Sequence, residues 1–346
     1  MDEYDIDSQK LIFHPKKVSD WLEGKQTYPI YVEISLTNLC NHNCIFCAPN
    51  FTRNGKSSLD TETVKKMIGH MWQIGVKAIM FGGEGEPLLH KDIAEIVKYA
   101  KELGLDIALT TNGVLFNKQK ALQLLPYLSW IKFSVDSGEI TTYAKLHGTK
   151  EEDFKTVLDN ISRSKFLIKL KKFDCTVGVQ TLLLKENIKT IPYLAKILKY
   201  LNADYLVLKP FSEHEKRIGD VIELPTIEEI EDAYIKSKEF ETDSYTIILR
   251  GNAIKCLNRK RTYEKCYAQD FIGYIDSYGG VHSCINFMDK PEYTYGNINN
   301  DSFENIWKSK PFIEPNLDGC RMGCRLNGIN IYLWELKNEK KHINFI

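Results

Sequence analysis

Short apolar runs alternate with amphipathic stretches from residue 31 onward, and this alternation is the main structural signal of the chain. The apolar runs are rich in Val, Ile, Leu and Phe and indicate buried strands, whereas apolar residues three and four apart indicate helices. Strands are predicted over residues 31–36, 77–81, 106–110, 130–135, 175–183 and 205–209. The helices predicted between them cover residues 61–74, 92–103, 118–127, 151–167 and 190–201.

Strand–helix repeats of this kind form a parallel sheet with right-handed crossovers. The pattern holds six such units, which is fewer than the eight that close a full barrel. The expected fold class is therefore α/β, with an open partial (β/α)6 barrel. In parallel α/β folds, ligands bind at the carboxyl ends of the strands, so the functional site is expected there.

The pattern changes after Phe211. Residues 225–240 form a charged amphipathic stretch, which Thr226 is expected to cap as a helix. The rest of the chain is rich in Gly, Tyr, Asn and Cys, and its core is too thin to stand without a metal. The domains expected from these changes are an N-terminal extension (1–30), the partial barrel (31–212), a helical linker (213–260) and a small auxiliary metal domain (261–346).

Charge and cysteine content narrow the class of protein. The 46 basic residues balance the 46 acidic ones, which disfavours a nucleic-acid enzyme. No segment reaches the ~18 uninterrupted apolar residues of a membrane span, and the acidic N-terminus is not a secretory signal. The nine cysteines, without an export signal, indicate metal binding in a reducing compartment. We therefore expect a cytoplasmic protein with no nucleic-acid or membrane partner.

Three cysteines lie close together in a loop after the first predicted strand, at positions Cys40, Cys44 and Cys47. Three thiolates can hold three corners of a [4Fe–4S] cluster and leave one iron open to a small molecule. A structural zinc site would use four closed ligands. Buried cysteines that merely pack as small apolar residues are the alternative, which the surrounding Asn- and His-rich loop disfavours.

The ends of the next three strands are polar. The second strand runs into Gly-Gly-Glu-Gly-Glu, where Gly82 and Gly83 allow the backbone to approach a ligand and Glu84 can accept from an ammonium group. The third ends in Thr110-Thr-Asn-Gly113 and the fourth in Ser134-Val-Asp136. Ordinary turn chemistry is an equally good explanation for Thr111, Asn112 and Asp136 taken singly. At the end of the sixth strand, Lys209 and His214 are candidates for facing a substrate.

The C-x3-C-x2-C loop, followed one strand–helix unit later by Gly-Gly-Glu, resembles the radical S-adenosylmethionine (radical SAM) superfamily. The resemblance implies a [4Fe–4S] cluster and S-adenosylmethionine (SAM), from which one electron releases a 5′-deoxyadenosyl radical that takes a hydrogen atom from the substrate. The electron would come from an external donor of the flavodoxin or ferredoxin type. The cluster ligands implied are Cys40, Cys44 and Cys47. The SAM-binding residues implied are Phe46 near the adenine, Gly82, Gly83 and Glu84 at the methionine amino group and Ser134 at the ribose, with Thr111, Asn112 and Asp136 as further candidates.

A second cysteine group lies near the C-terminus, and it resembles the SPASM/twitch modules that bind auxiliary iron–sulfur clusters. The number of cysteines allows one auxiliary [4Fe–4S] cluster. The resemblance implies Cys266, Cys284 and Cys324 as ligands, while Cys320 and Cys256 compete for the fourth position. The C-x2-C pair expected of such modules is missing here, and the irregular spacing disfavours the rival interpretation of a zinc ribbon.

An auxiliary cluster with four thiolate ligands cannot hold substrate and is suited to taking an electron from the substrate radical. The prediction is therefore a radical SAM oxidoreductase of the dehydrogenase type, as in the twitch-bearing aminocyclitol alcohol dehydrogenases. Its substrate would be a small hydroxylated molecule, such as a sugar or cyclitol. Three alternatives stay open: a radical epimerase with Cys256 as hydrogen donor, a maturase of a ribosomally made peptide, and a non-catalytic metal-binding protein.

Overall fold

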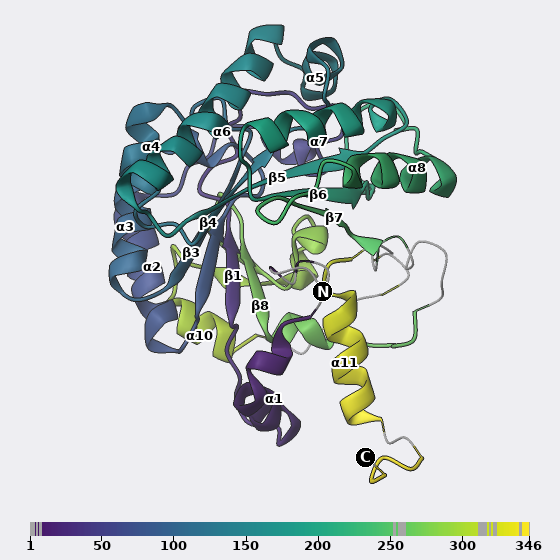
Figure 1. The fold of residues 1–346 in the computed structure, drawn as a ribbon. Coiled ribbons are helices and arrows are strands. Elements are labelled where there is room, and N and C mark those ends of the chain that lie inside the picture. Colours follow the sequence, from purple (N-terminus) through teal and green to yellow (C-terminus); the bar gives the residue numbers. More distant parts are fainter. Residues whose placement is uncertain are drawn as a thin grey trace.

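The computed structural model describes residues 4, 6, 9–251, 254, 261–310, 317, 320, 324–338 and 341–345. Cys256, the candidate hydrogen donor, lies outside these residues. Within them, ten strands form one sheet in the order β10-β9-β8-β1-β2-β3-β4-β5-β6-β7. The sheet curls so strongly that β1 and β7 run in different directions (Figure 1).

The six predicted strands are all present and pair in parallel in chain order, as a partial barrel requires. Their ends differ from the predicted ones by one or two residues. Their bounds are β1 (Tyr31–Ile34), β2 (Ala78–Phe81), β3 (Asp106–Thr111), β4 (Trp130–Ser134), β5 (Thr176–Leu183) and β6 (Tyr205–Pro210).

The predicted helices cover the outer face of the curled sheet (Figure 1). Several begin where a side chain caps the first backbone N–H groups: Asp60 accepts from the Thr63 N–H, and Thr226 forms a reciprocal capping box with Glu229. Their bounds are α2 (Thr61–Gln73), α3 (Ile93–Glu102), α4 (Lys118–Leu124), α6 (Glu151–Lys171), α7 (Ile191–Tyr200) and α8 (Ile227–Lys238).

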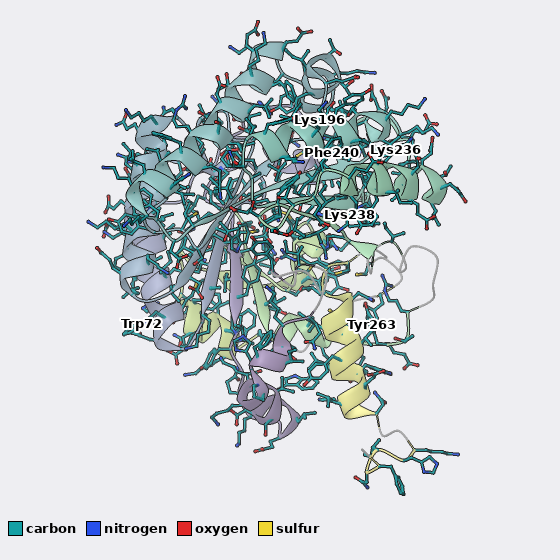
Figure 2. The ribbon with its side chains drawn as sticks, in the orientation of Figure 1. Trp72, Lys196, Lys236, Lys238, Phe240 and Tyr263 are labelled. Atoms are coloured by element: carbon teal, nitrogen blue, oxygen red, sulfur yellow. The ribbon has the colours of Figure 1, made fainter. Side chains whose placement is uncertain are left out.

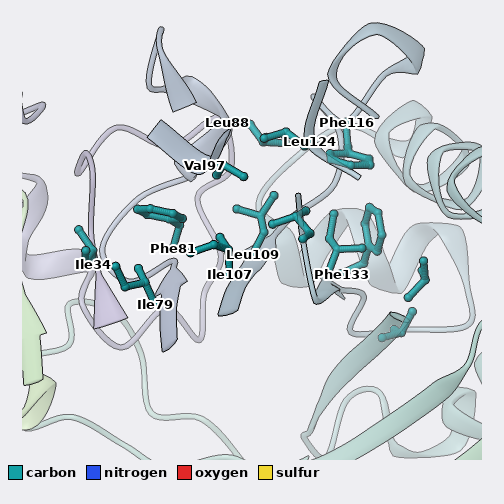
Figure 3. Close-up of a cluster of buried hydrophobic side chains, with 14 of the residues drawn as sticks. Ile34, Ile79, Phe81, Leu88, Val97, Ile107, Leu109, Phe116, Leu124 and Phe133 are labelled. Atoms are coloured by element: carbon teal, nitrogen blue, oxygen red, sulfur yellow. The ribbon is translucent and has the colours of Figure 1, made fainter. Parts of the chain in front are cut away.

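Alternate side chains of each strand enter the core between the sheet and these helices. Ile34, Phe81, Leu109 and Phe133 come from four neighbouring strands and are fully buried there (Figure 3). The residues next to them along each strand therefore face the inner side of the curled sheet, which we call the lumen face. On β1, β3 and β4 this face carries polar side chains, among them Glu33, Thr110 and Ser134, whereas Val207 and Ile248 make it apolar at β6 and β7.

Two further strands extend the parallel part of the sheet. β7 (Thr246–Leu249) pairs with β6 and lies in the stretch expected to be a helical linker. β8 (Ile272–Ile275) pairs in parallel with β1, and continues antiparallel into β9 (Gly280–His282) and β10 (Thr294–Asn297). The chain downstream of residue 261 thus contributes strands to the same sheet as the barrel.

The remaining elements were not predicted. The helices are α1 (Pro15–Leu22), α5 (Ile140–His147), α10 (Phe303–Lys308) and α11 (Asn327–Lys337). The short 3-10 turns are η1 (Leu11–Phe13), η2 (Asn50–Arg53), η3 (Pro87–Leu89), η4 (Ile188–Thr190), η5 (Tyr267–Asp270), η6 (Ile285–Phe287) and η7 (Pro291–Tyr293). Among the described residues, no helix has the length and apolar character that would let it cross a membrane.

Candidate active site

The three-cysteine loop follows β1 and is held by the end of α5. The backbone N–H groups of Asn43 and Ile45 donate to the carbonyl oxygens of His147 and Leu146, at 3.1 and 3.0 Å. Gly148 ends α5 with a φ of 54° and lies so close to Asn43 that a Cβ would overlap its carbonyl oxygen. A glycine is needed here both for the left-handed conformation and for the close approach.

The thiols of this loop lie in a half-buried, partly cationic setting. The Arg53 Nη2 donates to the Cys47 Sγ at 3.1 Å, and the His147 Nδ1 lies 3.5 Å from the Cys44 Sγ. Burial raises the pKa of all three thiols, that of Cys47 to about 11. A bound metal deprotonates a coordinating thiol outright, and the positive charge of Arg53 then stabilises the thiolate. Three soft thiolate donors in one loop fit an iron–sulfur cluster.

A carboxylate–histidine pair stands behind Cys44. The His147 Nε2 lies 3.1 Å from the Asp136 Oδ2, and the ring stacks on Tyr143 with centroids 4.1 Å apart. The other oxygen of Asp136 accepts from the Leu182 N–H at 2.6 Å. The structure therefore places Asp136 beside the histidine that contacts a cysteine, with both of its oxygens engaged by protein groups.

Glu84 offers one carboxylate oxygen to a ligand. The residue is 1% exposed, and its Oε2 accepts from the Ser277 N–H at 2.6 Å. Its Oε1 is buried and has no hydrogen-bond partner among the described residues, while burial raises the pKa of the carboxyl. An unpartnered buried carboxylate oxygen is costly unless a ligand donates to it, and the ammonium group of SAM fits this requirement.

The glycines before Glu84 and Glu86 bring their turn against the cysteine loop. Gly83 has a φ of 110°, and a Cβ there would lie 3.0 Å from the side chains of Ser35 and Tyr274. A Cβ on Gly85 would overlap the Leu39 carbonyl oxygen, directly before Cys40. Gly82 and Gly83 were predicted as binding residues from the sequence, whereas Gly85 was not.

Glu86 links this turn to the end of β3. Its carboxylate accepts from the Thr111 hydroxyl at 2.6 Å and from the Asn112 N–H at 2.8 Å, and burial raises its pKa to about 7. The Asn112 side-chain amide donates to the Asn41 Oδ1 at 2.7 Å, inside the cysteine loop. Thr111 and Asn112 are thus brought to the predicted site, where they form hydrogen bonds with Glu86 and Asn41.

Phe46 and Ser134 lie at the same edge of the sheet. Phe46 is buried in an apolar cluster with Leu146, Leu184 and Phe211, beside the cysteine loop. Ser134 is half-buried at the end of β4, in register with Gln180.

Four C-terminal cysteines line one pocket: Cys266, Cys284, Cys320 and Cys324. N–H groups donate to three of the sulfurs: the Asn330 side chain to Cys266 at 3.4 Å, the Leu326 backbone to Cys324 at 3.3 Å and the Asn286 backbone to Cys284 at 3.5 Å. N–H donors stabilise thiolate charge, and four converging thiols fit a second iron–sulfur cluster. Of the two competitors for the fourth position, Cys320 lines this pocket and Cys256 lies outside the described residues.

The two cysteine sites are connected through the sheet. The Arg325 Nη2, one residue after Cys324, lies 2.6 Å from the Glu33 Oε2 on β1. Ser277, whose N–H donates to Glu84, lies two residues after the end of β8. The C-terminal segment therefore contacts both the first strand and the candidate SAM site.

Two family models match the parts of the chain that hold these two cysteine sites. The family model of the radical SAM superfamily matches residues 34–198, and that of the iron–sulfur cluster-binding SPASM domain matches residues 266–327. The chain is 30% identical over 232 residues to the GTP 3′,8-cyclase of Chlorobaculum tepidum, covering 64% of this chain and 68% of that one. The chain belongs to the radical SAM superfamily. The predicted cofactors, a [4Fe–4S] cluster, SAM and an auxiliary cluster, are confirmed by these matches.

Other relatives agree with this assignment. A cofactor-modifying protein for tungsten-containing aldehyde ferredoxin oxidoreductase from Pyrococcus furiosus is 23% identical, with 82% of each chain covered. Among solved structures, Streptococcus suis SuiB bound to S-adenosylmethionine has a TM-score of 0.69 at 15% identity, covering 89% of this chain and 72% of that one. The SuiB structure supports the fold alone: an α/β partial barrel with a C-terminal iron–sulfur domain.

Proposed function

We propose that this radical SAM enzyme catalyses the two-electron oxidation of a small hydroxylated molecule, such as a sugar or cyclitol. The observation that carries the proposal is the pocket lined by Cys266, Cys284, Cys320 and Cys324. Four thiols can occupy all four corners of an auxiliary cluster, which leaves no corner for substrate. Such a site suits electron transfer better than substrate binding.

The residues of the first site divide into ligands and positioning groups. Cys40, Cys44 and Cys47 would hold the cluster that, with SAM, supplies a hydrogen-abstracting 5′-deoxyadenosyl radical. The free Oε1 of Glu84 would accept from the SAM ammonium group. Phe46 and Ser134 would contact the adenine and the ribose.

A second set of residues would act by positioning the cysteine ligands and the loop that carries them. Arg53 and His147 contact the sulfurs of Cys47 and Cys44, and Asp136 orients His147. Thr111 and Asn112, held by Glu86, would shape the loop edge. Outer partners of this kind orient metal ligands and tune the metal.

The proposed reaction is balanced without a further oxidant. The substrate loses one hydrogen atom to the 5′-deoxyadenosyl group, and then one proton and one electron. SAM becomes methionine and 5′-deoxyadenosine. The electron that enters from an external flavodoxin- or ferredoxin-type donor equals the electron that the substrate releases.

Product mass tests the proposal. Holoenzyme with SAM, a reductant and a panel of sugars and cyclitols should give one product two hydrogens lighter for each 5′-deoxyadenosine formed. A product with the mass of the substrate in H2O, and one mass unit more in D2O, would instead indicate epimerisation. In that case Cys256→Ala should abolish the deuterium incorporation if Cys256 is the donor.

Peptide modification is the second candidate. It is supported by a PqqA peptide cyclase of Rhodopseudomonas palustris that is 26% identical over 59% of this chain, although this chain covers only 53% of that protein. A crosslinked or cyclised peptide product, with no oxidised small molecule in the same assay, would favour this candidate over the first.

A further inference from the structure

A lysine projects from the middle of β4 onto the lumen face. Ile131 and Phe133 enter the core between sheet and helices, so Lys132 and Ser134 point to the opposite side. Two residues along a strand span about 7 Å. Lys132 therefore lies one step deeper in the barrel than Ser134, the predicted ribose contact.

Other cations reach the same region from neighbouring strands. Lys209 lies on the lumen face of β6, because Leu206 and Leu208 enter the core. Arg250 continues β7 beside it, and its backbone N–H donates to the Leu208 carbonyl oxygen at 3.0 Å. Their charges and that of Arg325, before α11, act on the Lys132 ammonium group. The carboxylate of Glu33 opposes them, and it pairs with Arg325 at 2.6 Å. The lumen face thus gathers four cations around one anion.

Lys132 itself has no ion-pair partner in the part of the chain that the structure describes. Its ammonium group lies 5.3 Å from the centroid of the Trp130 ring, an interaction that offsets little of the cost of desolvation. Burial, together with the neighbouring cations, lowers the pKa of Lys132 to about 7. Lys132 is half-buried, and a charge that is partly withdrawn from water normally has a hydrogen-bonded counter-charge.

We infer that Lys132, Lys209 and Arg250 receive an oxyanion of the substrate, a phosphate or a carboxylate, on the lumen face. This inference rests on the proposed function, because it places the substrate below SAM in the same barrel. It narrows the substrate to an anionic hydroxylated molecule, such as a phosphorylated sugar or a sugar acid. An aminated cyclitol, which is a cation at neutral pH, would be repelled.

The anion bound here is not the carboxylate of SAM. The resemblance to the superfamily implies that the carboxylate of SAM would bind at the open iron of the cluster, beside Cys40, Cys44 and Cys47. Glu84, the predicted partner of the amino group, lies beyond the end of β2, whereas Lys132 lies in the middle of β4. Adding saturating SAM to the binding assay therefore separates the two sites.

Calorimetric titration of the SAM-saturated holoenzyme, without reductant, tests the inference. The probes are inorganic phosphate and malonate, with glycerol and ethylammonium as the neutral and cationic comparisons. We expect both anions to bind and neither comparison to do so. Binding of only one anion would identify whether the substrate group is a phosphate or a carboxylate.

Two variants of equal charge change locate the site. Lys132→Met should weaken anion binding at least tenfold. Lys196→Met removes an exposed lysine on the outer helix α7 and should leave binding unchanged (Figure 2). Titrations in buffers of different ionisation enthalpy should show proton uptake on anion binding near pH 7.5 in wild type and in Lys196→Met, and none in Lys132→Met.

Either of two results would overturn the inference. In the first, glycerol binds as tightly as phosphate and malonate. In the second, Lys132→Met and Lys196→Met bind the anions with equal affinity. Because the titration needs no turnover, its result is independent of the product assay. A failed oxidation with intact anion binding would count against the proposed function alone.

Discussion

Glu33 and Arg325 form an ion pair, 2.6 Å between Oε2 and Nη2, that joins the first barrel strand to the auxiliary cysteine pocket. Glu33 is buried, whereas the Arg325 side chain is 39% exposed. Glu33→Gln should therefore lower the free energy of unfolding by about 1–3 kcal/mol, between the values of exposed and buried pairs. Denaturant titration of the holoenzyme measures this change.

The matched control for this pair is Glu304→Gln. It breaks the ion pair with Lys308, which is exposed on α10, and should change the same free energy by no more than about 0.5 kcal/mol. Equal effects of the two substitutions would show that the Glu33–Arg325 pair contributes no more than a surface pair.

Iron content distinguishes the two competitors for the fourth auxiliary ligand. Reconstituted wild type should hold about eight irons per chain, as two [4Fe–4S] clusters. Cys320→Ser should lose iron and the matching visible absorption, because Cys320 lines the pocket with the other three cysteines. Cys256→Ser should retain the iron and the absorption. The control Cys175→Ala, which removes a buried thiol directly before β5, should retain them too. Loss of the auxiliary cluster in Cys256→Ser alone would reverse the assignment.

Glu84→Gln should weaken SAM binding by about tenfold or more, since a hydrogen bond to a charged group contributes ~1.5–3 kcal/mol. Burial raises the pKa of Glu84, so its carboxylate is formed only above that raised value. Wild-type SAM affinity should therefore fall as the pH drops through this pKa, and the Gln variant should lose that dependence. Equilibrium dialysis measures both, with the exposed Glu62→Gln as control.

Lys132→Met should stabilise the protein, and the gain should depend on pH. The pKa of Lys132 is lowered to about 7 in the folded state, far below its value in the unfolded chain. Between pH 7 and pH 10 the folded state therefore binds fewer protons than the unfolded state. The free-energy cost of holding a charged Lys132 in the folded protein is fully present below pH 7, and it is relieved as the pH rises toward 10. The gain should be about 1–4 kcal/mol at pH 6 and shrink by pH 9 in denaturant titrations. A gain equal at both pH values would contradict this account, and Lys196→Met should show none.

Gly85→Ala should disturb the cysteine loop. Its Cβ would overlap the Leu39 carbonyl oxygen next to Cys40, and such overpacking costs about 1–3 kcal/mol. The midpoint temperature of thermal unfolding and the iron content of the first cluster should both fall. Gly24→Ala adds a Cβ at a φ of +73°, a backbone conformation that Gly85 does not share, and this Cβ meets nothing within 4 Å. It should lower stability by the backbone strain alone and leave iron content unchanged.

The features predicted best from the sequence are those in which the signal is local. The six strands β1 to β6 and the six helices that cover them followed from hydrophobic periodicity, because burial of one face imposes it directly. Cys40, Cys44 and Cys47 lie within one loop, so their spacing alone indicated a cluster. In contrast, α5 is short, with eight residues, and it was not predicted; the helix predicted over 151–167 corresponds to α6 alone.

Contacts between distant parts of the chain were not predictable. Ser277 donates to Glu84, and Arg325 pairs with Glu33, only because β8 lies beside β1. Four residues including a glycine, Ile272–Ile275, give too weak a strand signal to predict that pairing. Arg53 and His147 were not predicted either. A side chain that contacts a thiol does not alter the hydrophobic periodicity of the sequence.

The pairing of β8 with β1 also has a consequence during synthesis on the ribosome. β1 is among the first strands to emerge, yet one of its edges is covered by a strand encoded near the other end of the chain. Until Ile272–Ile275 has been made, that edge presents unpaired backbone groups, which promote misassembly with other chains. The pairing of this edge is thereby delayed until the segment that carries the auxiliary cysteines has begun to appear.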